Sequence, residues 1–165
     1  MEILFVRHAI AGLRDAEKWP DDRDRPLTPK GAAKFRRMAR ELRSLFPMPQ
    51  AVWSSPLARA WQTAEILVKE AGWPAPAGCG LLTPEAKPEA LIPFLRRQRS
   101  IETAVVIGHE PHLHEAISVA LAGSAELLRV EMKKGGAAGV RFPEEVLKGG
   151  GELTFLLPPR ALRRR

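Results

Sequence analysis

Two kinds of apolar pattern alternate along most of the chain. The first is a short, mainly apolar run, found at 3–6, at 51–54 and at 103–109. Runs without alternation are typical of strands buried on both faces of a parallel sheet. The second is an apolar residue at every third or fourth position, which is typical of a helix with one buried side. This second pattern occurs at 29–46, 56–71, 88–97 and 111–121.

Strands that alternate with helices in this way predict an α/β fold with a mostly parallel sheet between helices. Residues that favour helix starts support the boundaries. Thr28-Pro29 and Ser55-Pro56 each place a hydroxyl side chain before a proline, a combination that caps a first helical turn. We therefore expect Thr28 and Ser55 to cap their helices, and Gly72 to end the second one.

The pattern changes after Gly123. Residues 139–142 and 152–156 read as short strands, and the glycine-rich segment between them has no helical periodicity. We expect these strands to form an antiparallel hairpin at the edge of the sheet, and a weak further strand at 81–82. The predicted fold is a three-layer α/β/α sandwich, mostly parallel with an antiparallel C-terminal edge. No repeat or linker interrupts the chain, so residues 1–165 should form a single domain.

Composition and charge add three expectations. The chain has 165 residues and a net charge of +7, of which four charges come from Arg160, Arg163, Arg164 and Arg165. A basic end is more often solvated than bound, so we expect no nucleic acid as partner; RNA binding by the basic helix and this tail is a rival reading. Cys79 is the only cysteine, which excludes an internal disulfide. The first strand follows Met1 without a leader or a long apolar segment, so we expect a cytoplasmic protein with no membrane partner.

Cationic and imidazole side chains stand at the carboxyl ends of three expected strands. Arg7 and His8 follow the first, Ser54-Ser55 leads to Arg59, and His109 ends the third. The carboxyl ends of parallel strands share one edge, where open α/β sheets bind ligands. Guanidinium groups match phosphate oxygens, and helix N-termini add backbone donors. We therefore expect Arg7, His8, Arg59 and His109 to form a phosphate-binding pocket.

Other interpretations of these residues stay open. Arg59 could instead form a salt bridge with an aspartate of the polar segment 9–27, because a cation in a first helical turn opposes the helix dipole. A segment of this length usually carries function or covers a site. The histidines at 109, 112 and 114 match neither the His-Glu-x-x-His zinc helix nor a cysteine-assisted site, so we expect no metal.

Three segments carry a resemblance to a known family. They are LFVRH at 4–8, SSPLARAWQTA at 54–64 and VIGHEP at 106–111. In this order they resemble the three signatures of the histidine phosphatase superfamily, whose fold is phosphoglycerate mutase-like. The short chain, Arg-His-Ala in place of the commoner Arg-His-Gly, and Lys133-Lys134-Gly135-Gly136 are most similar to its small SixA-type phosphohistidine phosphatase branch. The resemblance extends over most of the chain.

The resemblance implies phosphoryl transfer in two steps, without a cofactor or metal. His8 would attack phosphorus as a neutral imidazole and form a phosphohistidine that water then hydrolyses. Arg7, Arg59 and His109 would hold the phosphoryl oxygens and stabilise their charge.

The substrate that this reading favours is phosphohistidine in a protein, because an imidazole protonated on its distal nitrogen leaves more easily than an alkoxide. A phosphatase of a small phosphomonoester is the alternative. It would need a general acid, for which Glu85 is the best-placed carboxylate, whereas helix capping is the simpler role for Glu110. A module that binds phosphate or a phosphoprotein without turnover is the rival from another class.

Overall fold

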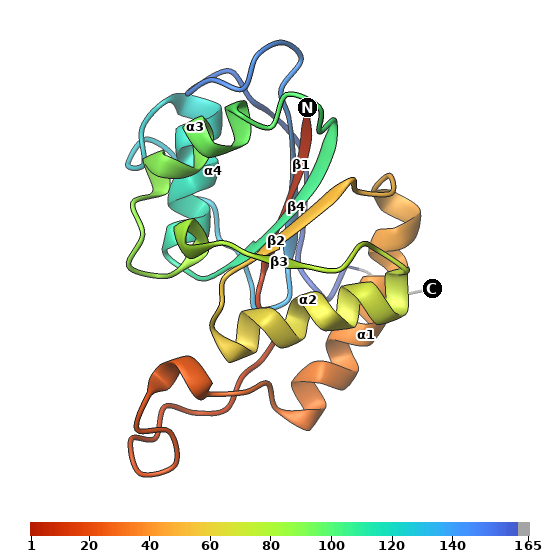
Figure 1. Cartoon of the computed structure of the whole chain (residues 1–165), viewed down its shortest axis with the longest axis vertical. Coiled ribbons are helices and arrows are strands. Elements are labelled where there is room, and N and C mark those ends of the chain that lie inside the picture. Colours follow the sequence, from red (N-terminus) through yellow and green to blue (C-terminus); the bar gives the residue numbers. More distant parts are fainter. Residues whose placement is uncertain (162–165) are drawn as a thin grey trace.

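A six-stranded sheet forms the centre of the computed structural model, which describes residues 1–161 (Figure 1). Its strands are β1 (Glu2–Arg7), β2 (Ala51–Ser54), β3 (Ala77–Gly78), β4 (Thr103–Gly108), β5 (Ala137–Arg141) and β6 (Glu152–Leu157). They lie in the order β3-β2-β4-β1-β5-β6. The first four strands are parallel, whereas β5 is antiparallel to both β1 and β6. The expected parallel sheet with an antiparallel C-terminal edge is confirmed.

Helices cover both faces of this sheet (Figure 1). The helices are α1 (Pro29–Leu45), α2 (Ala58–Ala71), α3 (Leu91–Arg96) and α4 (His112–Ala122), with short 3-10 helices η1 (Asp22–Asp24), η2 (Gly80–Leu82) and η3 (Pro88–Ala90). Leu4 and Val6 of β1 pack with α1 and α2, whereas Ile3 and Phe5 pack with α3 and α4. Successive side chains of β1 enter opposite cores, which explains why the strand is apolar at every position from Ile3 to Val6.

One of the two expected helix caps is wrong. The Thr28 hydroxyl accepts a hydrogen bond from the Gly31 N–H at 2.9 Å and caps α1, as expected. Ser55 does not cap α2, which begins at Ala58 after Leu57 and has no side-chain cap. The physical reason is that the Ser55 hydroxyl contacts His109 Nε2 at 2.9 Å and so belongs to the strand edge rather than to the helix.

The expected strand at 81–82 is also wrong. Those residues lie in η2, and the strand at this edge is β3, which pairs with Trp53 and Ser54 of β2. A helical turn places the Leu82 side chain in the core, where it is fully buried. Both residues of β3 are exposed, so this strand carries no hydrophobic signal in the sequence.

Two further expectations concern membrane-spanning helices and the basic tail. No helix within residues 1–161 is both long and apolar enough to cross a membrane. The arginines at 163–165, which supply most of the basic tail, lie outside the described residues.

Candidate active site

The carboxyl ends of β1, β2 and β4 meet at one edge of the sheet. Arg7 is the last residue of β1 and His8 follows it, while His109 follows β4 directly. Two backbone hydrogen bonds continue the pairing past the strands, from His8 N–H to the Gly108 carbonyl at 3.0 Å and from Ser55 N–H to the Ile107 carbonyl at 2.9 Å. The structure therefore brings together the segments that sequence reasoning placed at one edge.

His8 is buried and held in one tautomer. Its Nδ1 lies 2.7 Å from the carbonyl oxygen of Ala9. Because a carbonyl oxygen only accepts, Nδ1 carries the proton and Nε2 keeps a free lone pair. Burial, together with the charges of Arg59, Arg7 and Lys134, lowers the pKa of His8 to about 3. The side chain is therefore a neutral imidazole near pH 7, and its nucleophilic nitrogen is Nε2.

His109 lies against His8, with ring centroids 5.1 Å apart. The Ser55 hydroxyl accepts a long contact from Leu57 N–H at 3.4 Å and has its own proton to donate to His109 Nε2. When the hydroxyl donates to Nε2, the imidazole proton of His109 lies on Nδ1, which is buried without a partner within residues 1–161. Burial, together with the charge of Arg59, lowers the pKa of His109 to about 2. The ring is therefore neutral near pH 7, and in this tautomer Nδ1 is a donor.

Both predicted arginines are held through one nitrogen each. Arg7 Nη1 donates to the Met132 carbonyl at 2.6 Å, and Arg59 Nη1 donates to the Asp22 carbonyl at 2.9 Å. The Nε atoms of both arginines are buried and have no hydrogen-bond partner within the described chain. Burial is the main cause that lowers the pKa of each guanidinium, although arginine stays charged in proteins.

Unsatisfied buried donors concentrate in this pocket. Within residues 1–161, six buried side-chain nitrogen or oxygen atoms have no partner, and three of them are Arg7 Nε, Arg59 Nε and His109 Nδ1. Each such group costs about 1–3 kcal/mol unless a ligand satisfies it. Two cationic donors and a neutral imidazole donor beside His8 suit an anion with several acceptor oxygens, and phosphate is one.

Comparisons with known proteins agree with this geometry. Residues 3–78 match the model of the histidine phosphatase superfamily (branch 1). An uncharacterized protein of Picosynechococcus sp. is 36% identical over 167 residues, which cover 98% of this chain and 99% of that protein. The chain belongs to the histidine phosphatase superfamily.

Solved structures of similar proteins narrow the assignment to one branch of this superfamily. The protein histidine phosphatase SixA in complex with tungstate matches with a TM-score of 0.86 and 25% identity, over 99% of this chain and 100% of that chain. Phosphoserine phosphatase from Entamoeba histolytica, in complex with phosphoserine, gives a TM-score of 0.69 at 15% identity, over 96% and 98%. Alpha-ribazole phosphatase from Shigella flexneri gives 0.73 at 16%, over 96% and 97%. The chain belongs to the SixA-type branch, and its family supports phosphatase activity.

The salt bridge expected as the alternative role of Arg59 is confirmed, whereas phosphate binding by Arg59 stays a prediction. Arg59 Nη1 forms an ion pair with Asp22 Oδ2 at 3.3 Å, and Asp22 lies in the polar segment 9–27. Asp22 also binds Arg25, whose hydrogen bond is the main cause that lowers the pKa of the carboxyl group. The salt bridge engages the far end of the guanidinium and leaves Nε for the pocket. Asp22 thus positions Arg59 rather than competing with it.

Thr63 is a site residue that sequence reasoning missed. Its hydroxyl accepts from Ala9 N–H at 3.0 Å and donates to the Arg59 carbonyl at 2.7 Å. It therefore links the residue after His8 to the helix that carries Arg59. Thr63 lies within the second family signature, which is the only signal in the sequence that could have found it.

The segment that marks the SixA-type branch lies against the end of β1. Gly135 N–H donates to the carbonyls of Arg7 at 3.2 Å and His8 at 3.0 Å. Gly135 has a φ of 74°, a conformation that favours glycine. The charge of Lys134 is one of the causes that lower the pKa of His8. Sequence reasoning used this segment as a branch marker without assigning it a place in the pocket.

The two candidate carboxylates differ in burial and in the arginine on which their charge acts. Glu85 is exposed, and its charge is among the causes that raise the pKa of Arg59, so it lies on that side of the pocket. Glu110 is half-buried and bonds to His114 Nδ1 rather than to a backbone N–H, so its expected role as a helix cap is wrong. Burial raises the pKa of Glu110.

The histidines at 109, 112 and 114 do not converge. His112 is buried with both ring nitrogens unpartnered within the described chain, and His114 pairs with Glu110 instead. Among residues 1–161, no group of three or more His, Cys, Asp or Glu side chains could hold a metal ion.

Proposed function

We propose that this chain is a metal-independent phosphatase that transfers a phosphoryl group to His8 and then to water, and that its substrate is phosphohistidine in a protein. One observation carries the proposal: a neutral His8 with a free Nε2 lies beside buried donors that have no partner in the described chain. Phosphoryl transfer needs such donors to bind oxygens while the nucleophile attacks phosphorus. Tungstate, the ligand of the SixA structure, is a tetrahedral oxyanion like phosphate, which supports the same reading.

The first step makes one bond and breaks one. Nε2 of His8 attacks phosphorus as the bond to the substrate imidazole breaks, and that imidazole departs neutral because it keeps the proton on its distal nitrogen. The His8 ring now carries both the phosphoryl group and the Nδ1 proton. The Ala9 carbonyl, which accepts a hydrogen bond from Nδ1, stabilises the resulting positive charge.

In the second step, water is the nucleophile and His8 is the leaving group. A water molecule attacks phosphorus, the bond to Nε2 breaks, and His8 leaves as the same neutral tautomer with its proton still on Nδ1. Arg7, Arg59 and His109 hold the three phosphoryl oxygens during both steps. Two guanidinium charges at this position supply the electrostatic stabilisation that a metal ion gives other phosphoryl-transfer enzymes, so the proposal includes no metal.

The leaving group favours phosphohistidine. A protonated phosphoimidazole needs no further proton on departure, and the proposed pocket residues include no carboxylic acid. Asp22, whose charge acts on Arg59 and His109, is bonded to Arg25 and Arg59. Glu110, whose charge acts on Arg7, is bonded to His114.

A small phosphomonoester is the second candidate substrate, and Glu85 is the observation that favours it. An alkoxide leaving group needs a proton, and Glu85 lies near enough to Arg59 for its charge to act on that side chain. Under this alternative, Glu85→Gln lowers kcat for an alkyl phosphate much more than for phosphoramidate.

Steady-state turnover tests the proposal against a binding module. The wild-type chain should release phosphate continuously from phosphoramidate, and His8→Ala should abolish release. His114→Ala is a matched control, because His114 is bound to Glu110 and is no part of the proposed pocket. Binding of phosphate without release by the wild type would favour the module instead.

A further inference from the structure

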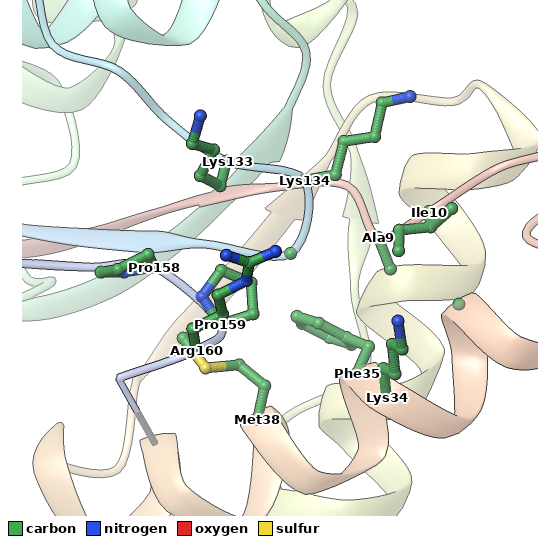
Figure 2. A pocket seen from close by; sticks show the side chains of 12 residues that line it. Ala9, Ile10, Lys34, Phe35, Met38, Lys133, Lys134, Pro158, Pro159 and Arg160 are labelled. Carbon is green, nitrogen blue, oxygen red and sulfur yellow. The ribbon is translucent and has the colours of Figure 1, made fainter. Parts of the chain in front are cut away.

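A surface groove of about 530 Å³ lies next to the proposed active site (Figure 2). Ala9, which follows His8, lines it, and so does Gly135, whose N–H donates to the His8 carbonyl at 3.0 Å. The groove runs from there between α1 and the residues that follow β6. It is lined by none of the four residues of the proposed phosphate pocket. It is a separate surface that begins one residue away from His8.

The floor and one wall of this groove are apolar. Figure 2 shows the ring of Phe35 extending from α1 toward Pro159. Phe35 and Met38 are almost fully buried and form the base, whereas Ile10, Pro158 and Pro159 retain accessible surface.

The rim of the groove is basic. Lys34, Lys133, Lys134 and Arg160 line it, and none of its twelve described lining residues is acidic. Lys133 forms an ion pair with Glu131, whereas the other three cations have no ion-pair partner within residues 1–161. In Figure 2, Lys34 and Arg160 lie on either side of Phe35. Three of the four rim cations are thus without a compensating carboxylate within residues 1–161.

We propose that this groove binds an acidic segment of the substrate protein, next to its phosphohistidine. The inference rests on the proposed function and adds the chemistry of the partner. A polypeptide whose phosphohistidine reaches His8 must continue across the adjoining surface. Carboxylates on that segment would pair with Lys34 and Arg160, and its apolar side chains would pack on Ile10, Pro158 and Pro159.

A protein segment fits this groove better than a nucleic acid does. Single-stranded nucleic acids stack their bases on exposed aromatic faces. Phe35 is the only aromatic among the described lining residues, and only 2% of its surface is exposed. The surfaces that remain accessible are proline rings, Ile10 and cationic side chains, which suit carboxylates and small apolar side chains.

Two synthetic phosphohistidine peptides test the inference. They share one sequence, except that glutamates flanking the phosphohistidine in the first are lysines in the second. At low salt, the wild-type chain should show a kcat/KM about 10-fold higher for the acidic peptide, because complementary charges raise the encounter rate. Lys34→Glu/Arg160→Glu should remove or invert this preference, and high salt should remove it in the wild type.

A matched variant and a small substrate separate docking from catalysis. Arg43→Glu/Lys148→Glu changes the net charge equally at two exposed positions outside the groove, so it should keep the preference. Phosphoramidate has no flanking segment, so the groove variant should turn it over at the wild-type rate. Equal kcat/KM for both peptides in the wild type, or an equal loss of preference in the matched variant, would overturn the inference.

Binding measurements keep this inference distinguishable from the proposed function. Fluorescence anisotropy of the labelled acidic peptide with His8→Ala should show affinity that falls about 10-fold when the groove substitutions are added. This result supports docking even if the wild type fails to turn over phosphoramidate, which would refute only the proposed function. Competition by poly(U) RNA at the same affinity as the acidic peptide would overturn the choice of an acidic protein segment.

Discussion

Replacing Thr63 by valine tests how the pocket is held together. The Thr63 side chain is fully buried, and its hydroxyl accepts from Ala9 N–H and donates to the Arg59 carbonyl. Valine keeps the shape and removes both hydrogen bonds. The Arg59 carbonyl keeps its partner within α2, so the main loss is a buried, unsatisfied Ala9 N–H. Such a donor costs about 1–3 kcal/mol, so the free energy of unfolding should fall by that amount.

Urea and thermal unfolding measure the loss of stability, and steady-state kinetics measure the loss of activity. A loss of this size lowers Tm by about 2–4 °C for each kcal/mol in a chain of this length. Because Ala9 follows His8, a shift at Ala9 also misplaces the nucleophile, and kcat/KM for phosphoramidate should fall about 10-fold. Thr63→Ser keeps the hydroxyl and should retain most of the activity. A valine variant with wild-type stability and wild-type kinetics would refute the proposed linkage between His8 and α2.

Three further predictions follow from the same pocket. The pKa values of His8, about 3, and His109, about 2, lie below the ordinary value, so the unfolded chain binds more protons between about pH 6.5 and 3. The unfolding free energy should therefore fall on acidification, by up to about 1.4 kcal/mol per pH unit for each histidine. Urea unfolding at several pH values should show a smaller slope of unfolding free energy against pH for His8→Asn/His109→Asn. An unchanged slope would contradict this prediction. Inorganic phosphate at about 100 times its Kd for the wild type should stabilise the wild type by about 2.7 kcal/mol in thermal unfolding. Equal stabilisation of Arg59→Ala at the same phosphate concentration would argue against the anion pocket. Gly135→Ala should lower the unfolding free energy by about 1–2 kcal/mol, because Gly135 has a φ of 74°, and an undiminished stability would contradict the backbone argument.

The parts that the sequence predicted correctly have local signals. β1 and β4 contain unbroken apolar runs, at 3–6 and 104–107, because helices cover both faces of the sheet. Their carboxyl ends share one edge, and this topological rule placed Arg7, His8 and His109 together without any structure. Arg59 was expected close to the end of the second strand, and it lies in the first turn of α2, which follows β2.

The parts that it could not predict depend on long-range contacts or on weak patterns. Thr63 bonds to Ala9, 54 residues away in the chain, and nothing in the local sequence indicates that partner. Ser55 has the sequence of a helix cap, but its hydroxyl bonds to His109 instead, so a tertiary contact overrides the local preference. The strand Ala77–Gly78 has only two residues, both exposed, and therefore shows neither apolar run nor alternation.

Trapping the intermediate tests the central claim most directly. The wild-type chain is mixed with isotopically labelled phosphoramidate and stopped within a turnover in alkaline denaturant, which preserves phosphohistidine. Peptide mass spectrometry then locates the label. We predict label on His8 in the wild type and none in His8→Ala. Label on another residue, or steady phosphate release from His8→Ala at the wild-type rate, would contradict the account.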